Sequence, residues 1–383
     1  MKLLSKVFTV CFAFCLLTAC DTVVEVSPGK DLDTDKLADL IEQRLKGNCV
    51  GYQFTIGFKG ENKVMRAGGD ARLAPDANPR AMLITDRYTL ASVSKNITAT
   101  ALMQLLAAKG LTLDTKLAPY LPAHWKVSAS LQTVTFRQLL THTSNLYDTQ
   151  TDYQTLKNFA DTATRNSPTG YRNVNYALLR FAIVQLSGKT VTSLPNNATS
   201  SQRQQVEAKQ SQEYGDNYVA YCQENIFGKI GSYPNVNCKQ LPDSDNPGLC
   251  YQFPKDGKSG EPWFDFTTMA GSQGWYMTSA QLASYFGKLM YSTQLLPSAT
   301  TTQMRTESMG FFSSQTPKGL ACYYHNGYYP GQGYGNKGEL NTIMIGYDNG
   351  IQIALIINSQ YTNPTFSNNY GLALHDAIDT WNK

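Results

Sequence analysis

Ser92-Val93-Ser94-Lys95 is the stretch of sequence on which the interpretation of this chain depends. Apolar residues follow it at helical spacing and Gly110 then stops the pattern, which predicts a helix starting near Ser92. Residues three apart lie on one helix face, so the Lys95 amine can reach the Ser92 hydroxyl. Burial would lower the pKa of Lys95 and make it a base for a serine nucleophile. The alternative is a chance pattern, with a capping serine and a solvated lysine.

A second polar cluster, Tyr171-Arg172-Asn173, follows a turn-forming Pro168-Thr169-Gly170 and precedes an apolar helical run. A tyrosine beside a lysine can have a lowered phenol pKa and can relay protons to a leaving group. An asparagine amide can hold a substrate carbonyl. We therefore expect Tyr171 and Asn173 to join Ser92 and Lys95. Without them, a tyrosine packed at a helix start would be the simpler interpretation.

The two ends of the chain predict a shared sheet. Asp35 to Leu45 has the spacing of an amphipathic helix, and alternation from Tyr52 to Phe58 predicts a strand. Near the other end, Leu340 to Tyr347 and Ile351 to Asn358 are β-branched runs joined by a hairpin turn. A last helix is expected around Ala373 to Trp381. Signals between the two ends are mostly helical, which predicts an α/β (α+β) fold with a helical insertion and a cleft at the junction.

One segment inside the helical region looks different. Residues 192–216 are rich in Asn, Ser, Gln and Thr. This composition predicts an exposed loop.

Further segments give the chain a family resemblance from about Asp35 to its C-terminus. The segments are Asp114 to Pro122, Thr135 to Ser144, Glu224 to Phe227 and Gly271 to Ser279. Together with the two clusters, they resemble the serine β-lactamase-like hydrolases: class C β-lactamases, D-alanyl-D-alanine carboxypeptidases and related esterases. The resemblance implies a β-lactamase/penicillin-binding-protein-like fold over residues 33–383. Its α/β part would comprise about 33–91 and 305–383, and its helical part about 92–304.

The resemblance also implies roles for single residues. Ser92 would be acylated and would supply one oxyanion N–H, Lys95 would accept its proton, and Tyr171 would act as acid and base. Asn173 would hold the substrate amide. No cofactor is implied.

A third motif of the family, Lys-Thr-Gly or His-x-Gly, is matched here to Asn336-Lys337-Gly338. Asn336 would replace the usual cation, unless a shift of register brings Lys337 to the cleft. Gly338 would allow close approach of the substrate, and Glu339 would supply the second oxyanion N–H. The substrate stays open among a D-Ala-D-Ala-like peptide, a β-lactam and an ester. Without the cation, the peptide and the β-lactam, which both carry a carboxylate, are less favoured than the ester.

Two other features have competing explanations. His142 suggests a Ser-His-Asp triad, but no Gly-x-Ser-x-Gly elbow accompanies it and the resemblance makes it structural. Tyrosines crowd one region and either line the cleft or pack on an edge strand. They are Tyr323, Tyr324, Tyr328, Tyr329 and Tyr334.

The N-terminus has the pattern of an export signal. Lys2 and Lys6 precede a short apolar run that ends in Leu17-Thr18-Ala19-Cys20. This pattern predicts a lipoprotein signal over residues 1–19, lipid on Cys20 and a tether over residues 20–32. The protein would then be anchored to a membrane of the bacterial cell envelope and face the periplasm. A plain secretory signal that happens to contain Cys20 is the alternative.

Composition narrows the range of partners. The chain has 383 residues, 42% of them hydrophobic, and a net charge of +4. Removal of residues 1–19 takes away two lysines, so the net charge becomes +2 (4 − 2). With no basic run, nucleic acid is not an expected partner. The four histidines are scattered and no Cys-x-x-Cys occurs, so no metal site is expected.

Five cysteines follow Cys20, an odd number for a chain expected to leave the cytoplasm. Cys238 and Cys250 flank a turn-rich stretch, and we predict that they form a disulfide.

Two functions remain open. One is a serine hydrolase that forms an acyl-enzyme on an amide or ester bond. The other is a catalytically silent lipoprotein that binds peptidoglycan or a protein partner through the same fold. Intact Ser92, Lys95, Tyr171 and Asn173 favour the enzyme.

Overall fold

The computed structural model describes residues 32–231, 236–240, 246–262, 264–330 and 338–382. The predicted signal peptide, Cys20 and nearly all of the tether lie outside these ranges. No helix in the described part is long and apolar enough to cross a membrane.

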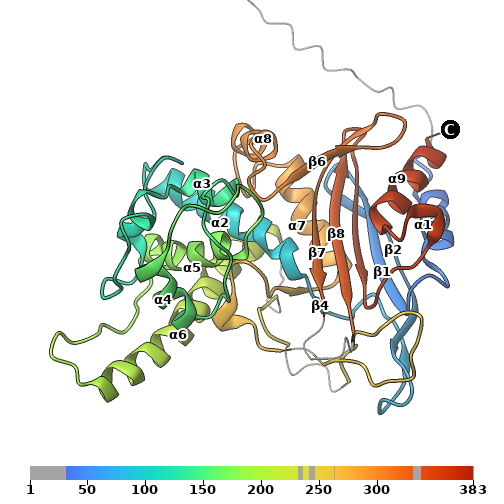
Figure 1. The fold of residues 1–383 in the computed structure, drawn as a ribbon. Coiled ribbons are helices and arrows are strands. Elements are labelled where there is room, and N and C mark those ends of the chain that lie inside the picture. The colour runs from blue at the N-terminus through green and yellow to red at the C-terminus, as the bar shows by residue number, and fades with distance from the viewer. Residues whose placement is uncertain (1–31, 232–235, 241–245, 263, 331–337, 383) are drawn as a thin grey trace, which may run out of the picture. The chain divides into compact units, whose positions relative to one another are not determined.

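A seven-stranded antiparallel sheet joins the two ends of the chain (Figure 1). Its order is β3 (Arg80–Ala81), β2 (Glu61–Arg72), β1 (Gly51–Phe58), β9 (Ile351–Ile357), β8 (Leu340–Tyr347), β7 (Ala321–Tyr329) and β6 (Phe312–Gln315). In the centre, Phe54 of β1 is opposite Leu355 of β9. β8 and β9 are buried along their whole length. The sheet predicted from distant segments is confirmed.

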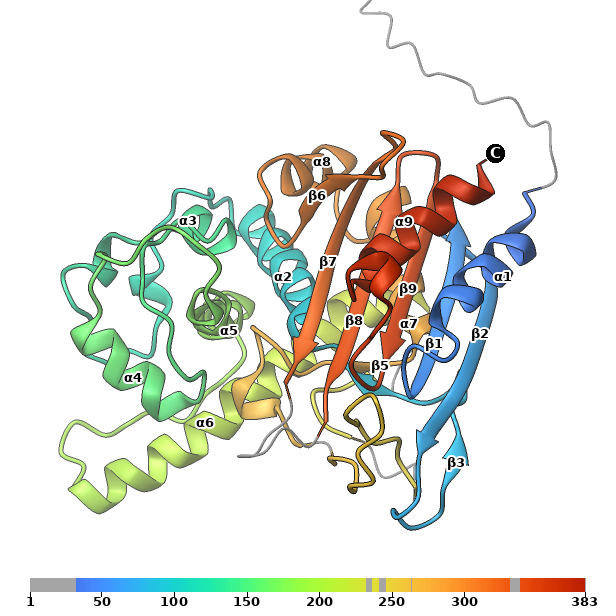
Figure 2. The same ribbon diagram turned by 45° about the vertical axis from the view of Figure 1, so that its right-hand side comes forward.

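Helices cover the sheet on two faces. α1 (Thr34–Leu45) and α9 (Tyr370–Trp381) contact each other on one face, in front of the strands in Figure 2. α7 (Ser279–Tyr291) packs on the other face against β1 and β9. A buried hydrogen bond of 3.0 Å joins the Thr55 and Ser279 hydroxyls there. α7 therefore packs with the α/β part of the fold, although its residues fall in the range predicted for the helical part.

The remaining helices lie beside the sheet (Figure 1). They are α2 (Ser94–Ala108), α3 (Phe136–Leu140), α4 (Tyr153–Thr162), α5 (Asn173–Ser187), α6 (Ser200–Cys222) and α8 (Ser298–Thr306). α2 and α5 contact each other and are almost entirely buried. Their N-terminal ends carry the two polar clusters seen in the sequence.

The exposed loop predicted for residues 192–216 is wrong from Ser200 onward. α6 starts there with a capping box, in which the Thr199 hydroxyl accepts from the Gln202 N–H and Gln202 bonds back to Thr199. Tyr214, Tyr218 and Cys222, each four residues apart, bury one stripe of the helix. Most residues of the segment are polar because they lie on the solvent-exposed side of the helix. Gln, Glu and Lys are also good helix formers.

The predicted Cys238–Cys250 disulfide is also wrong. Both thiols are free and buried, as are those of Cys49, Cys222 and Cys322. Cys250 is held by a bridge to Glu261, whereas the residue before Cys238 pairs with Tyr276. Two different backbone partners thus fix the two cysteines, and nearness in sequence did not bring them together.

Candidate active site

Ser92 lies in a tight turn between the sheet layer and α2. β4 (Tyr88–Thr89) pairs with β5 (Tyr276–Met277) and leads into the 3₁₀ turn Ala91–Val93. Ala91 has a φ of 45°, a left-handed conformation that is costly for a residue with a side chain. The strained residue directly before Ser92 turns the chain sharply and sets the serine at the start of α2.

The Lys95 amine lies against Ser92 as the helical spacing predicts. Lys95 Nζ is 3.0 Å from Ser92 Oγ and donates at 2.8 Å to both Asn173 Oδ1 and the Ser272 carbonyl. The Lys95 side chain is fully buried. Helix α2, helix α5 and the loop before β5 thus converge on one amine.

Burial changes the acidity of that amine. Loss of solvent lowers the pKa of Lys95 to about 7, against an opposing effect of the Asp148 carboxylate. A lysine with this pKa is substantially neutral at neutral pH. Its lone pair can then accept the Ser92 proton.

The Tyr171 ring lies against the same lysine. Lys95 Nζ is 4.7 Å from the centre of the Tyr171 ring, and Ser92 lies near enough to the phenol to affect its pKa. Burial raises the pKa of Tyr171, although Ser92 opposes it. The predicted lowering of this pKa is wrong, because desolvation and the Asp148 charge both raise it and outweigh the effect of Ser92. Tyr171 is therefore a neutral phenol at neutral pH.

His142 supports the tyrosine. Its ring centre lies 4.5 Å from that of Tyr171, and its Nδ1 accepts from the Arg172 N–H at 3.2 Å. Burial, with the charges of Lys95 and Arg172, lowers the pKa of His142 to about 3. A neutral imidazole packed against the Tyr171 ring at an interplanar angle of 35° has the geometry of a support for the phenol.

Asp148 is a residue that the sequence interpretation missed. Its Oδ1 accepts from the Val174 N–H at 3.0 Å at the start of α5, and its Oδ2 lies 3.5 Å from Asn173 Nδ2. Asn173 therefore turns its oxygen to Lys95 and its amide nitrogen to Asp148. Asp148 follows the Thr135 to Ser144 segment by four residues. No local sequence pattern indicates that its carboxylate contacts Asn173 and Val174.

The roles assigned from the sequence to Gly338 and Glu339 of the third motif are wrong. Gly338 packs against Cys250, whose carbonyl would lie 2.4 Å from an added Cβ. The Glu339 N–H donates to the Tyr251 carbonyl at 3.1 Å, so it is not directed at Ser92. Asn336 and Lys337 lie outside the described residues. The pairing with Tyr251 fixes Glu339 beside that residue, directly before β8.

β7 is the strand that approaches the nucleophile, through His325-Asn326-Gly327. A Cβ on Gly327 would lie 2.3 Å from the Leu90 carbonyl and 3.2 Å from the Ala91 Cβ. Burial, with the charge of Lys95, lowers the pKa of His325 to about 3, so its ring is neutral. A His-x-Gly pattern was present in the sequence, but only the sheet order shows that it faces Ser92.

The register of β7 also turns one backbone amide away from the neighbouring strand β8. The Asp348 N–H donates to the Ala321 carbonyl at 3.0 Å, and the strands then pair Cys322 with Tyr347. Antiparallel residues alternate between bonding their partner and pointing away, so every second residue from Ala321 bonds to β8. The N–H of Tyr328 therefore points away from β8, past the end of β6.

Beside Asn173, a hollow of about 350 Å³ opens from the site. Asp148 is the charged residue among its described lining, which otherwise consists of Thr149, Gln150, Thr151, Asn173 and Gln273. The Arg172 guanidinium is directed elsewhere, to the Tyr171 carbonyl and to the Ser167 hydroxyl.

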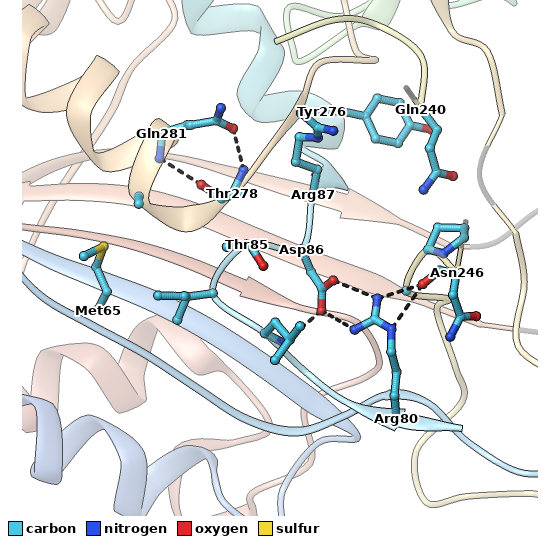
Figure 3. Close-up of a pocket in the computed structure, with 15 residues that line it drawn as sticks. Met65, Arg80, Thr85, Asp86, Arg87, Gln240, Asn246, Tyr276, Thr278 and Gln281 are labelled. Carbon is cyan, nitrogen blue, oxygen red and sulfur yellow. Dashed lines mark hydrogen bonds and ion pairs between the residues drawn. The ribbon is translucent and has the colours of Figure 1, made fainter. Parts of the chain in front are cut away.

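A second hollow, of about 700 Å³, lies beside β2 (Figure 3). Arg80 donates to both carboxylate oxygens of Asp86 at 2.8 and 2.7 Å and also to the Asn246 carbonyl. Thr278 and Gln281 bond each other at the start of α7. These polar groups satisfy one another, and Ser92 is not among the lining residues. In the described part of the chain, no cluster of three His, Cys, Asp or Glu could hold a metal ion.

The family model named Beta-lactamase matches residues 37–377, and the chain belongs to this family. Among solved structures, D-amino acid amidase from Ochrobactrum anthropi SV3, complexed with L-phenylalanine, is 17% identical with a TM-score of 0.67. The match covers 91% of this chain and 99% of the amidase.

Two other solved structures are similar. The β-lactamase/D-alanine carboxypeptidase from Yersinia pestis is 18% identical with a TM-score of 0.65, over 92% of this chain and 100% of that one. The octameric penicillin-binding protein homologue from Pyrococcus abyssi is 16% identical with a TM-score of 0.66, over 92% and 78%. At these identities the likeness establishes the β-lactamase/penicillin-binding-protein-like fold.

Proposed function

We propose that this protein is a serine hydrolase that forms an acyl-enzyme on Ser92 from an amide or ester substrate. The observation that carries the proposal is the buried Lys95 amine, with its pKa lowered to about 7, at 3.0 Å from the Ser92 hydroxyl. A lysine with only a structural role would not need a serine hydroxyl, an asparagine and a tyrosine gathered around its amine.

Acylation follows from these positions. Neutral Lys95 takes the proton of Ser92 as Oγ attacks the substrate carbonyl. The N–H groups of Ser92 and Tyr328 hold the oxygen that becomes negative. The neutral Tyr171 phenol gives its proton to the leaving nitrogen or oxygen, and the Lys95 ammonium replaces that proton. Water then releases the acyl group by the same route in reverse, and both residues return to their starting state.

The charges around Ser92 favour a particular kind of substrate. His325 is neutral where a cation would meet a substrate carboxylate. The adjoining hollow presents the Asp148 carboxylate instead. We propose that amides or esters with a free amine near the scissile bond react faster than substrates with a carboxylate there. The structural likeness to a D-amino acid amidase is consistent with this preference.

The cellular setting is part of the proposal. Lipid on Cys20 would hold the protein to a membrane of the bacterial envelope, with the cleft in the periplasm. The pattern at Leu17-Thr18-Ala19-Cys20 supports this setting. Mass spectrometry of the N-terminal peptide from native membranes tests it, and an unmodified Cys20 would contradict it.

Labelling of the purified protein tests the chemistry. We expect a fluorophosphonate to label Ser92, and Ser92→Ala and Lys95→Ala to abolish labelling. Lys109→Ala is the matched control, since Lys109 is an exposed lysine at the far end of α2. Absence of an adduct from both a fluorophosphonate and a fluorescent penicillin would favour the silent binding protein.

Substrate preference is tested separately with Asp148→Asn. The wild type should hydrolyse an amino-acid amide faster than its N-acetylated form, and the variant should lose that preference. Equal rates on the two substrates in the wild type would contradict the proposed role of Asp148, while leaving the acyl-enzyme chemistry standing.

A further inference from the structure

We propose that the face of β7 and β8 turned away from Ser92 binds a neutral oligosaccharide. The site is the groove formed by two adjoining hollows of about 770 and 380 Å³. Tyr328, Asn341, Asn368 and Tyr370 line both hollows, so the hollows form one groove. We call it the β7 groove. It lies on the face of the sheet opposite to the catalytic side chains, and the proposed hydrolysis uses the backbone N–H of Tyr328 but not its side chain.

The groove exists because the helices do not cover all of the sheet. α9 crosses in front of β8 and β9, while β7 lies beside it (Figure 2). Side chains alternate along a strand, so Tyr324, Asn326 and Tyr328 share the face opposite to His325 and Gly327. Tyr324, Asn326 and Tyr328 line the groove. Of the tyrosines that crowd this part of the sequence, Tyr324 and Tyr328 lie on this face of β7. Tyr323 and Tyr329 lie on the opposite face.

Aromatic surface is the first requirement of a sugar site, because the C–H faces of a pyranose pack on aromatic rings. Tyr328 is 51% exposed at the centre of the groove. Tyr370 is fixed by a hydrogen bond of 3.3 Å from its hydroxyl to the Thr342 carbonyl. A third ring, Tyr361, lies perpendicular to Tyr370 at 6.4 Å. Rings held in place lose little entropy when a ligand packs on them.

Amides between the rings supply the second requirement. A side-chain amide offers donors and an acceptor in one plane, which suits adjacent hydroxyls of a sugar. Asn326 and Asn368 are exposed in the groove. Asn341 is oriented by its bond of 2.9 Å to the Ser359 carbonyl. Tyrosine rings and an asparagine amide alternate along this face of β7, and an oligosaccharide presents sugar rings and hydroxyl groups to match them.

The charge of the groove selects the ligand class. The described lining of the larger hollow contains no Asp, Glu, Lys or Arg, and burial lowers the pKa of its His375. In the smaller hollow, Glu339 is bonded by Gln360 at 2.7 Å. Without cations, the groove offers nothing to a phosphate chain or an anionic lipid headgroup. A neutral polyhydroxylated chain satisfies the rings and the amides together.

Calorimetric titration of the purified protein with an N-acetylglucosamine hexamer tests the proposal, with cellohexaose as a second probe. We expect one of the two to bind with a Kd of about 10⁻⁴ M, as expected for a few ring contacts. Tyr328→Ala should weaken binding about tenfold. Asn326→Ala should weaken it as well.

Tyr323→Ala is the matched control. Tyr323 is on the same strand but faces the other way, with its ring 4.9 Å from the Arg305 guanidinium. The control should bind the sugar as the wild type does, and the Tm of each variant establishes that it is folded. Absence of binding by both hexamers, or equal loss in Tyr323→Ala and Tyr328→Ala, would overturn the proposal. Neither result bears on the labelling of Ser92.

Discussion

At the residue scale, desolvation decides the chemistry of the site. Lys95 is fully buried and Tyr171 is 37% exposed, so desolvation acts on both, yet the effects on their charges differ. Burial disfavours the ammonium of Lys95 and the phenolate of Tyr171, so it lowers one pKa and raises the other. The outcome is a neutral base beside a neutral acid. Helical spacing was enough to predict the pairing of Ser92 with Lys95, but not the state of the phenol.

The pH dependence of catalysis follows from Lys95. Activity needs the neutral amine, so kcat/KM should rise with pH through about 7 and then level off. Because burial favours the neutral form, the inflection should lie well below the usual range of a lysine. Initial rates across pH 5 to 10 measure it. If the Lys95→Arg variant kept its activity and showed the inflection at the same pH as the wild type, the titrating group would be a residue other than Lys95.

Tyr171 gives a second prediction at this scale. Tyr171→Phe removes the proton donor but leaves Ser92 and Lys95 in place, so kcat should fall by about 10²–10⁴-fold. Fluorophosphonate labelling should persist more than turnover does, because this reagent carries a leaving group that needs little proton transfer. Wild-type kcat in Tyr171→Phe would contradict the assignment.

At the element scale, the close approach of β7 to the 3₁₀ turn Ala91–Val93 completes the site. Gly327 permits this approach, since a Cβ there would meet the Leu90 carbonyl and the Thr342 hydroxyl, each at 2.3 Å. The Thr342 hydroxyl itself donates to the Leu90 carbonyl at 2.9 Å. The strand, the turn and the neighbouring strand are thus locked together behind Ser92. A shift of any one of them would move the nucleophile.

Gly327→Ala tests this contact. We expect the free energy of unfolding to fall by about 1–3 kcal/mol through overpacking, with slower labelling of Ser92. Urea unfolding and labelling rates measure the two effects. Gly170→Ala is the control, because an added Cβ there would meet only the flexible Arg172 side chain, at 3.4 Å. Equal stability of both variants would contradict the proposed lock.

At the scale of the whole molecule, packing rather than cross-linking holds the chain together. The two ends meet in β1 and β9, and the five described cysteines are buried as thiols. Burial raises the pKa of each of these thiols. Thiols that are inaccessible and protonated react slowly with oxidants and with one another.

We therefore expect the Tm of the protein to be the same with and without a reductant. A thiol reagent should react slowly with the native protein and at Cys49, Cys222, Cys238, Cys250 and Cys322 after unfolding. Mass spectrometry of the alkylated, non-reduced chain measures this. A peptide linking Cys238 to Cys250 would contradict the structure and restore the disulfide predicted from the sequence.

Local sequence determined the parts of this protein that depend on near neighbours. The pairing of Ser92 with Lys95 follows from helical spacing, and the strands at both ends follow from alternation and turn residues. Tertiary structure decided which distant groups meet: His325 and Gly327 instead of Gly338 and Glu339 at the site, Asp148 against Asn173, and different backbone partners for the segments of Cys238 and Cys250. It also revealed the buried stripe of α6. The reason is physical, because spacing acts within a few residues, whereas burial, sheet order and pKa depend on packing between segments far apart in the chain.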